Sequence, residues 1–324
     1  MKKLLLLSLI ISLLLFSMSC KKDDDVIVDN QETPPDKTPF QELYDQGIDK
    51  YLGVFKPISS TMVLPGVTEH IFSGTNAPIC FTGNEFSMFT RDGIINKLLI
   101  FLQGGGFCSP LACEAVEEGI PLFPFGILNP ADPQNPTSNF DVGYVPYCDG
   151  SGMMGDNAGG FAVHAALPLV RKLYPDVRIE VINDSGVGIL SPGGMQTLID
   201  YWNAGAFFPS SCTNCIGADG NLTDYHKYQL AQDPNIRMAY ISSKQDATFA
   251  ALIQGGAAAF EAQLIEASGE LNAAFPDRFN CLIANGNGHT FLIRDFTFQL
   301  STTSVRFWVN EMISESSTWN SVID

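Results

Sequence analysis

The segment Lys97-Leu98-Leu99-Ile100-Phe101-Leu102 is a continuous apolar run that ends at Gly104-Gly105-Gly106. Such a run predicts a strand that is buried on both faces, as in the centre of a parallel sheet. Further strands are expected at residues 140–147, 177–182, 236–242 and 279–284, and residues 86–91 are expected to start the sheet as an antiparallel strand. Helices are expected at residues 159–173, 194–202, 257–275 and 305–313. This alternation predicts a mostly parallel sheet with helices on both faces.

The composition excludes several classes of protein. The chain has 324 residues, of which 45% are hydrophobic and 11% aromatic, so it is not intrinsically disordered. A formal net charge of -17 is opposite to the basic face that nucleic-acid binding requires, so no nucleic-acid partner is expected. The sequence contains no internal repeat and no strong linker in its middle, so residues 41–324 are expected to form a single domain.

The N-terminal segment has the pattern of a targeting sequence. Residues 1–19 combine a short cationic start, an apolar run and small residues, which predicts a signal peptide; the alternative is an anchor that stays in place. Cys20 follows in a context that resembles a bacterial lipobox, which would make it the lipidated N-terminus. Residues 20–40 then predict a flexible tether. Residues 21–25 (KKDDD) also resemble the export signal of some Bacteroidetes surface lipoproteins.

These features predict an exported lipoprotein at the outer membrane or cell surface of a Gram-negative bacterium. Because the chain is acidic, it is expected to attach to a membrane through its lipid anchor alone.

Seven cysteines follow Cys20, and export permits disulfides among them. Two pairs are close in sequence: Cys108 with Cys113, and Cys212 with Cys215. The CxxC motif at Cys212 lacks the second CxxC or nearby histidine of a zinc site and lies in a loop, so a structural disulfide is expected. The odd number leaves one thiol free or intermolecular.

Polar clusters follow several of the expected strands, where open α/β sheets bind ligands. The glycines at 104–106 let backbone N–H groups approach an oxyanion, or they form a tight turn. Asp246 could orient a catalytic histidine, or it could cap the helix that begins near Ala247. His289 lies in a glycine-rich loop and could be a general base, or a loop histidine without a role.

The order of acid and then histidine, each after its own strand, matches that of α/β-hydrolases. The other histidines are weaker candidates. His164 is expected to be structural, and His70 and His226 have no evident partners.

The chain resembles the pectin acetylesterase/Notum family over about residues 80–289. The motifs that carry this resemblance are Phe101–Cys108 (FLQGGGFC), Cys113, Tyr144–Gly150 (YVPYCDG), Ala158–Gly160, Asn183–Gly186 (NDSG), Gln245–Asp246 and Gly288–His289. The family consists of serine esterases with the α/β-hydrolase fold, so the resemblance implies hydrolysis of carboxylic esters such as acetylated polysaccharide. It implies no metal and no organic cofactor.

The resemblance also implies roles for individual residues. Asp246 would be the triad acid and His289 the general base. The backbone of Gly105 and Gly106, with the N–H of Ala158, would form the oxyanion hole. Cys80, Cys108, Cys113 and Cys148 would be framework cysteines.

The sequence departs from the family at the nucleophile. In Gly155–Gly160 (GDNAGG), Asn157 occupies the position of the serine, and an amide cannot form an acyl intermediate. Cys148 and Asn157 are also too close for the helix and strand that the family has between them, since such a crossover needs a dozen or more residues. The expected fold is therefore an α/β-hydrolase-like sheet that lacks one strand-helix unit near residue 157.

Three explanations remain open: a deletion or mis-assembled gene, a non-catalytic descendant that binds glycan or acyl ligands at the surface, or catalysis by another serine such as Ser151 or Ser185.

Overall fold

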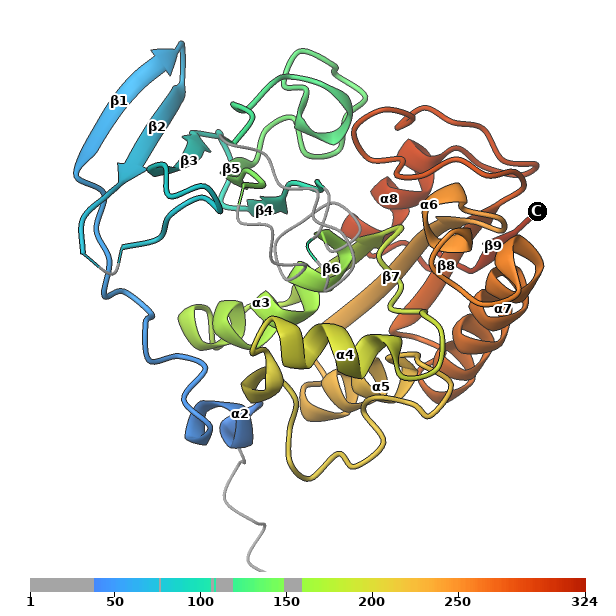
Figure 1. Cartoon of the computed structure of the whole chain (residues 1–324). Coiled ribbons are helices and arrows are strands. Elements are labelled where there is room, and N and C mark those ends of the chain that lie inside the picture. Colours follow the sequence, from blue (N-terminus) through green and yellow to red (C-terminus); the bar gives the residue numbers. More distant parts are fainter. Residues whose placement is uncertain (1–37, 76, 106–107, 109–118, 149–158) are drawn as a thin grey trace, which may run out of the picture. The chain divides into compact units, whose positions relative to one another are not determined.

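The computed structural model describes residues 38–75, 77–105, 108, 119–148 and 159–324 (Figure 1). The chain divides into two units, Met1–Thr38 and Pro39–Asp324, and all the helices and strands described below belong to the second. The expected signal peptide and Cys20 lie outside the described residues, as does most of the tether. None of the helices in the described ranges combines the length and apolar character needed to cross a bilayer.

The first sheet is mainly antiparallel. Its strands, in spatial order, are β1 (Ser59–Leu64), β2 (Val67–Phe72), β3 (Phe86–Arg91), β5 (Asp141–Val145) and β4 (Leu98–Leu102). The pairs β1–β2, β2–β3 and β3–β5 are antiparallel, and β4–β5 is parallel. The antiparallel start at residues 86–91 is therefore confirmed.

The second sheet is parallel throughout. Its strands, in spatial order, are β6 (Ile179–Asp184), β7 (Ile236–Ser243), β8 (Phe279–Ala284) and β9 (Val322–Ile323). Their register places Asp184 beside Ile241 and Ser243 beside Ala284. The carboxyl ends of β6, β7 and β8 therefore meet at one edge, so residues that follow these strands can share a site.

Helices connect these strands (Figure 1). They are α2 (Gln41–Asp45), α3 (Gly159–Leu173), α4 (Gly194–Tyr201), α5 (Thr223–Gln232), α6 (Ala247–Ala250), α7 (Gly256–Ala274) and α8 (Val305–Ile313), with short 3₁₀ turns η1 (Gly126–Leu128) and η2 (Gly205–Phe207). The four expected helices are confirmed as α3, α4, α7 and α8. Helix α5 was not expected because most of its buried side chains, including His226 and Gln229, are polar and hide its apolar period.

The core has two parts, one on each face of the second sheet. On β7, Met238 and Tyr240 pack into the part that contains residues of α4, α5 and α7. The alternate residues Ala239 and Ile241 pack into the part that contains residues of α8. This alternation is the period-two pattern of a strand covered on both faces. The expected mixed α/β fold with helices on both faces is confirmed.

The prediction that residues 97–102 are buried on both faces is wrong. In β4, the exposed fractions are 43% for Leu98 and 36% for Ile100. Among the described residues β4 pairs with β5 alone and ends its sheet, so one edge of it is open. The expectation of a mostly parallel sheet holds for the second sheet and not for the first. The unit expected to be missing near residue 157 falls outside the described residues.

Disulfides join the expected cysteines. Cys212 and Cys215 form a disulfide, as expected, and a second one joins Cys80 to Cys148. Cys108 is also disulfide-bonded. Among the described cysteines, Cys281 is the free thiol that the odd count predicts, and it is buried.

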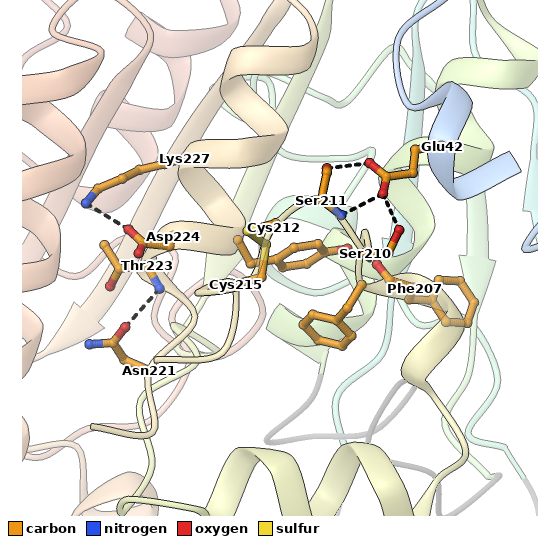
Figure 2. Close-up of a disulfide and its surroundings, with 12 residues drawn as sticks. Glu42, Phe207, Ser210, Ser211, Cys212, Cys215, Asn221, Thr223, Asp224 and Lys227 are labelled. Carbon is orange, nitrogen blue, oxygen red and sulfur yellow. Dashed lines mark hydrogen bonds and ion pairs between the residues drawn. A yellow bond between two sulfur atoms is a disulfide. The ribbon is translucent and has the colours of Figure 1, made fainter. Parts of the chain in front are cut away.

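The Cys212–Cys215 disulfide lies next to the residues that fix α2 to the rest of its unit (Figure 2). The Glu42 carboxylate accepts hydrogen bonds from the Ser210 hydroxyl and the Ser211 backbone N–H, both at 2.7 Å, and from the Ser211 hydroxyl. The two serines directly before the disulfide therefore present donors to an acidic side chain of α2.

Candidate active site

Asp246 and His289 come together at the carboxyl edge of the second sheet. Asp246 follows β7 and His289 follows β8. Nδ1 of His289 lies 2.7 Å from Oδ2 of Asp246. Because a carboxylate accepts hydrogen bonds, Nδ1 carries the proton and Nε2 is the basic nitrogen of the ring. The side chain of Asp246 is 0% exposed and that of His289 is 18% exposed. Nε2 of His289 is itself buried, so both the carboxylate and the basic nitrogen are shielded from solvent.

Asp246 makes both of the contacts that its sequence position permits. It is the N-cap of α6, and its Oδ1 accepts hydrogen bonds from the N–H groups of Thr248 at 2.9 Å and Phe249 at 3.2 Å. Its other oxygen receives the imidazole. The cap therefore fixes the carboxylate that orients His289.

The loops after β7 and β8 continue the pairing of their strands. The N–H of Lys244 donates to the carbonyl of Ala284 at 2.9 Å, and the N–H of Gln245 donates to that of Gly286 at 3.0 Å. One step further, the N–H of Ala247 donates to the carbonyl of Asn287 at 3.1 Å. These bonds keep the two loops in register, so the acid and the base are held by the backbone as well as by their side chains.

Gly105 lies just beyond the carboxyl end of β4. A Cβ at this position would lie 1.6 Å from Cδ1 of Tyr147, so no other residue fits without moving that ring. The close packing on Tyr147 is a structural reason for this glycine beside its expected role in an oxyanion hole. Gly106, Asn157 and Ala158 lie outside the described residues.

Asp184 and Ser185 lie at the end of β6 and bond the segment that follows His289, a contact that sequence reasoning missed. Oδ2 of Asp184 accepts hydrogen bonds from the N–H groups of Phe291 at 2.9 Å and Leu292 at 2.8 Å. Oγ of Ser185 accepts from the N–H of Thr290 at 3.0 Å. The sequence signals for these two residues are the NDSG motif and its position after a strand that neighbours β7.

The pKa of Asp184 is raised to about 6, chiefly because burial disfavours its charged form. The N–H groups of Leu292 and Phe291 and the charge of His289 act in the opposite direction, and the charge of Asp246 adds to the increase. A second carboxylate therefore stands within electrostatic reach of the Asp246–His289 pair.

The serines beside the His289 loop are inaccessible. Ser185 and Ser242 are 0% exposed, and Ser243 is 1% exposed. Ser185 also uses its Oγ as an acceptor for Thr290. The structure therefore argues against Ser185 as a nucleophile, and Ser151 lies outside the described residues.

The other histidines have partners that the sequence did not reveal. His164 is structural, as expected: Nδ1 bonds Oε1 of Gln229 at 2.7 Å. His70 and His226 had no partners evident from the sequence, because the groups that they bond lie on other segments of the chain. His70 bonds the hydroxyls of Ser60 and Thr90, and His226 bonds that of Tyr240.

A polar cavity of about 420 Å³ lies at the opposite end of the second sheet, beside the first residues of β6, β7 and β8. Its arginines already have partners. Arg178 pairs with Glu180 and Glu315, and Arg278 donates to backbone carbonyls. These groups stabilise the amino ends of the strands. In the part of the chain that the structure describes, no group of three or more His, Cys, Asp or Glu residues could hold a metal ion.

Comparisons with known sequences and with solved structures give different results. No model of a known family matches the chain, and no curated protein does. Two solved structures similar to it are crystal forms of the Wnt deacylase Notum from Drosophila. Each is 14% identical, and the alignment covers 74% of this chain and 91% of the Notum chain, with TM-scores of 0.49 and 0.48.

Proposed function

We propose that the chain is a carboxylic-ester hydrolase whose acid–base pair is Asp246 and His289. The observation that carries the proposal is the 2.7 Å bond from Nδ1 of His289 to a fully buried carboxylate. This arrangement fixes the tautomer that makes Nε2 a base, and it stabilises the imidazolium once a proton has been taken.

The chemistry follows from that base. Nε2 removes the proton of an attacking serine hydroxyl as its oxygen adds to the ester carbonyl carbon. When the tetrahedral intermediate collapses, the C–O bond to the alcohol breaks and Nε2 returns the proton to the leaving oxygen. Water then attacks the acyl–serine ester and gives a proton to Nε2, which returns it to the serine oxygen as the carboxylic acid leaves. The reaction class is acyl transfer to water through a serine ester, and it needs no metal or organic cofactor.

The proposed substrate is an acylated, in particular acetylated, polysaccharide or a related ester. The ordered motifs from FLQGGGFC to Gly288–His289, which resemble pectin acetylesterases, support this class. The acidic chain gives no reason to expect a polyanionic partner such as nucleic acid.

A second function is favoured by Asn157, which stands where the family has its serine. A chain without that nucleophile would be a surface lipoprotein that binds glycan or acyl ligands without cleaving them. The exposed apolar side chains of β4 agree with the loss of a neighbouring strand, and that loss would also remove the nucleophile's support.

A fluorophosphonate probe separates the two functions. Labelling of one serine that disappears in His289→Ala supports the hydrolase. Absence of labelling, together with retained binding of an acetylated oligosaccharide, supports the binding protein.

We also propose that Cys20 is lipidated and anchors the chain to the outer membrane or cell surface. In cells, Cys20→Ala is expected to move the protein from the membrane fraction to the soluble fraction. Retention of the variant in the membrane fraction would contradict this anchor.

A further inference from the structure

The backbone that follows His289 is bonded at three consecutive residues by the turn that ends β6. The N–H of Thr290 donates to Oγ of Ser185 at 3.0 Å. The N–H of Phe291 donates to both oxygens of Asp184 at 2.9 Å, and that of Leu292 donates to Oδ2 at 2.8 Å. We propose that Asp184 and Ser185 are positioning residues that keep the imidazole of His289 aligned on Asp246. The catalytic part of this inference rests on the proposed function.

Both sides of this contact adopt a backbone conformation that ordinary residues avoid. The φ angle is 64° at Ser185 and 63° at Thr290. A left-handed conformation is strained in any residue other than glycine, so it persists where its surroundings over-determine it. Here the two strained residues hydrogen-bond each other, and Thr290 is the residue directly after the proposed base. Strain at this pair therefore serves the placement of His289.

The turn that carries Asp184 and Ser185 is itself held rigidly. The side chain of Asn183 accepts from the N–H of Gly186 at 2.8 Å and donates to the carbonyl of the same residue at 2.9 Å. Its Nδ2 also bonds Nε2 of His164 at 3.0 Å. The N–H of Ser185 donates to the carbonyl of Ile241 in β7 at 2.8 Å. The turn is thus tied both to the helix layer and to the strand that precedes Asp246.

Below the turn, a proline leaves one backbone carbonyl of α3 without its usual donor within the helix. Pro168 lies inside α3 and has no N–H for the carbonyl of His164, four residues earlier. Nε2 of Gln229 donates to that carbonyl instead at 2.7 Å, while Oε1 of Gln229 accepts from Nδ1 of His164. With Nδ1 protonated, Nε2 of His164 accepts the Asn183 amide, so each polar group in this buried chain of bonds is used.

Asp184 acts on the imidazole through charge as well as through the backbone. The charges of both His289 and Asp246 affect the pKa of this carboxylate, so His289 has two acidic neighbours. In this proposal the two carboxylates act differently. Asp246 contacts the ring directly, while Asp184 fixes the segment that carries the ring.

The test uses two variants in the full chain. Asp184→Asn preserves the shape but removes one acceptor and the charge. Ser185→Gly removes the hydroxyl and relieves the positive φ, so the result does not depend on strain. The matched control is Glu180→Gln, because Glu180 is also a half-buried carboxylate on β6 with a pKa raised by burial, at the other end of the strand.

Two readouts apply to every variant: amide hydrogen exchange at residues 290–292, and the NMR signal of the His289 Nδ1 proton, identified by its loss in His289→Gln. Asp184→Asn and Ser185→Gly are expected to speed exchange at these amides by about tenfold or more and to broaden or move the Nδ1 signal. Glu180→Gln is expected to change neither. Where hydrolysis is measured, kcat is expected to fall while KM stays near its wild-type value.

The outcomes separate this inference from the proposed function. Unchanged exchange and an unchanged Nδ1 signal in both variants would overturn the positioning role, whatever the activity. Faster exchange with an unmoved Nδ1 signal would also overturn it, because the loop would then be held without aligning the ring. A wild-type chain that hydrolyses no ester would refute the proposed function, while the NMR comparison would still decide whether the two residues align His289.

Discussion

A single carboxylate, that of Asp246, caps helix α6 with one oxygen and receives Nδ1 of His289 on the other at 2.7 Å. The two roles can be separated by substitution, because asparagine is as good an N-cap as aspartate but carries no charge.

Asp246→Asn is therefore expected to keep the stability of the fold and lose activity. Ester hydrolysis should fall by about 10²–10⁴-fold, because the imidazolium loses its counter-charge and the tautomer is no longer fixed. Asp246→Ala should lose the same activity and also about 1 kcal/mol of unfolding free energy through the lost cap. Steady-state kinetics and urea unfolding of both variants test this. Full activity in Asp246→Asn would show that the pairing has no catalytic role.

The buried histidines make stability depend on pH. Burial lowers the pKa of His164 to about 4, and burial together with the charge of His164 lowers the pKa of His226 well below its usual value. An unfolded histidine titrates near 6.5. Between pH 6.5 and about 4, these histidines are therefore protonated in the unfolded chain but stay neutral in the folded chain. Stability contributed by these groups is lost as the pH falls through this window, by up to about 1.4 kcal/mol per pH unit and group.

Asp184 changes the stability in the opposite direction as the pH falls. Its folded pKa of about 6 lies above its unfolded value of 3.8, so the folded chain binds the extra proton and gains stability as the pH falls from 6 to 4. Between pH 7 and 5, His164→Gln should therefore lose less unfolding free energy than the wild type, and Asp184→Asn should lose more. Urea unfolding at several pH values measures the slopes. Equal slopes in all three proteins would refute both assignments.

The two disulfides with described partners should differ in their contribution to stability. Cys80 and Cys148 are 68 residues apart, whereas Cys212 and Cys215 are 3 apart. The loop-closure estimate is about 4 kcal/mol for the long loop and about 2 kcal/mol for the short one. Paired Cys→Ala variants under non-reducing conditions, compared by urea unfolding, should show that order. A larger loss from the short disulfide would mean that its contacts near Glu42, and not loop closure, dominate.

The sequence was sufficient to predict the pairing of Asp246 and His289. Each follows a strand, β7 or β8, whose apolar run is recognisable locally, and parallel neighbours bring their carboxyl ends together. The helices α3 and α7 were predictable for a similar reason, since their apolar period lies within one segment.

Other features depend on contacts that no local pattern encodes. Asp184 reaches Phe291 across 107 positions of the chain, so the NDSG motif that contains it did not reveal this contact. Strand β1 is exposed along its whole length and shows no alternation, so it was not expected. The apolar run of β4 predicts burial, because apolar side chains favour it. The structure instead leaves Leu98 and Ile100 partly exposed at a sheet edge.

The measurement that tests the central claim most directly is the hydrolysis of p-nitrophenyl acetate by the wild-type chain and by His289→Ala. If His289 is the general base, the wild-type rate exceeds the buffer rate and the variant is slower by at least about a hundredfold, with an unchanged thermal midpoint. Equal rates in the two proteins, or a wild-type rate no higher than that of buffer, would contradict the assignment of Asp246 and His289 as the acid–base pair of an ester hydrolase.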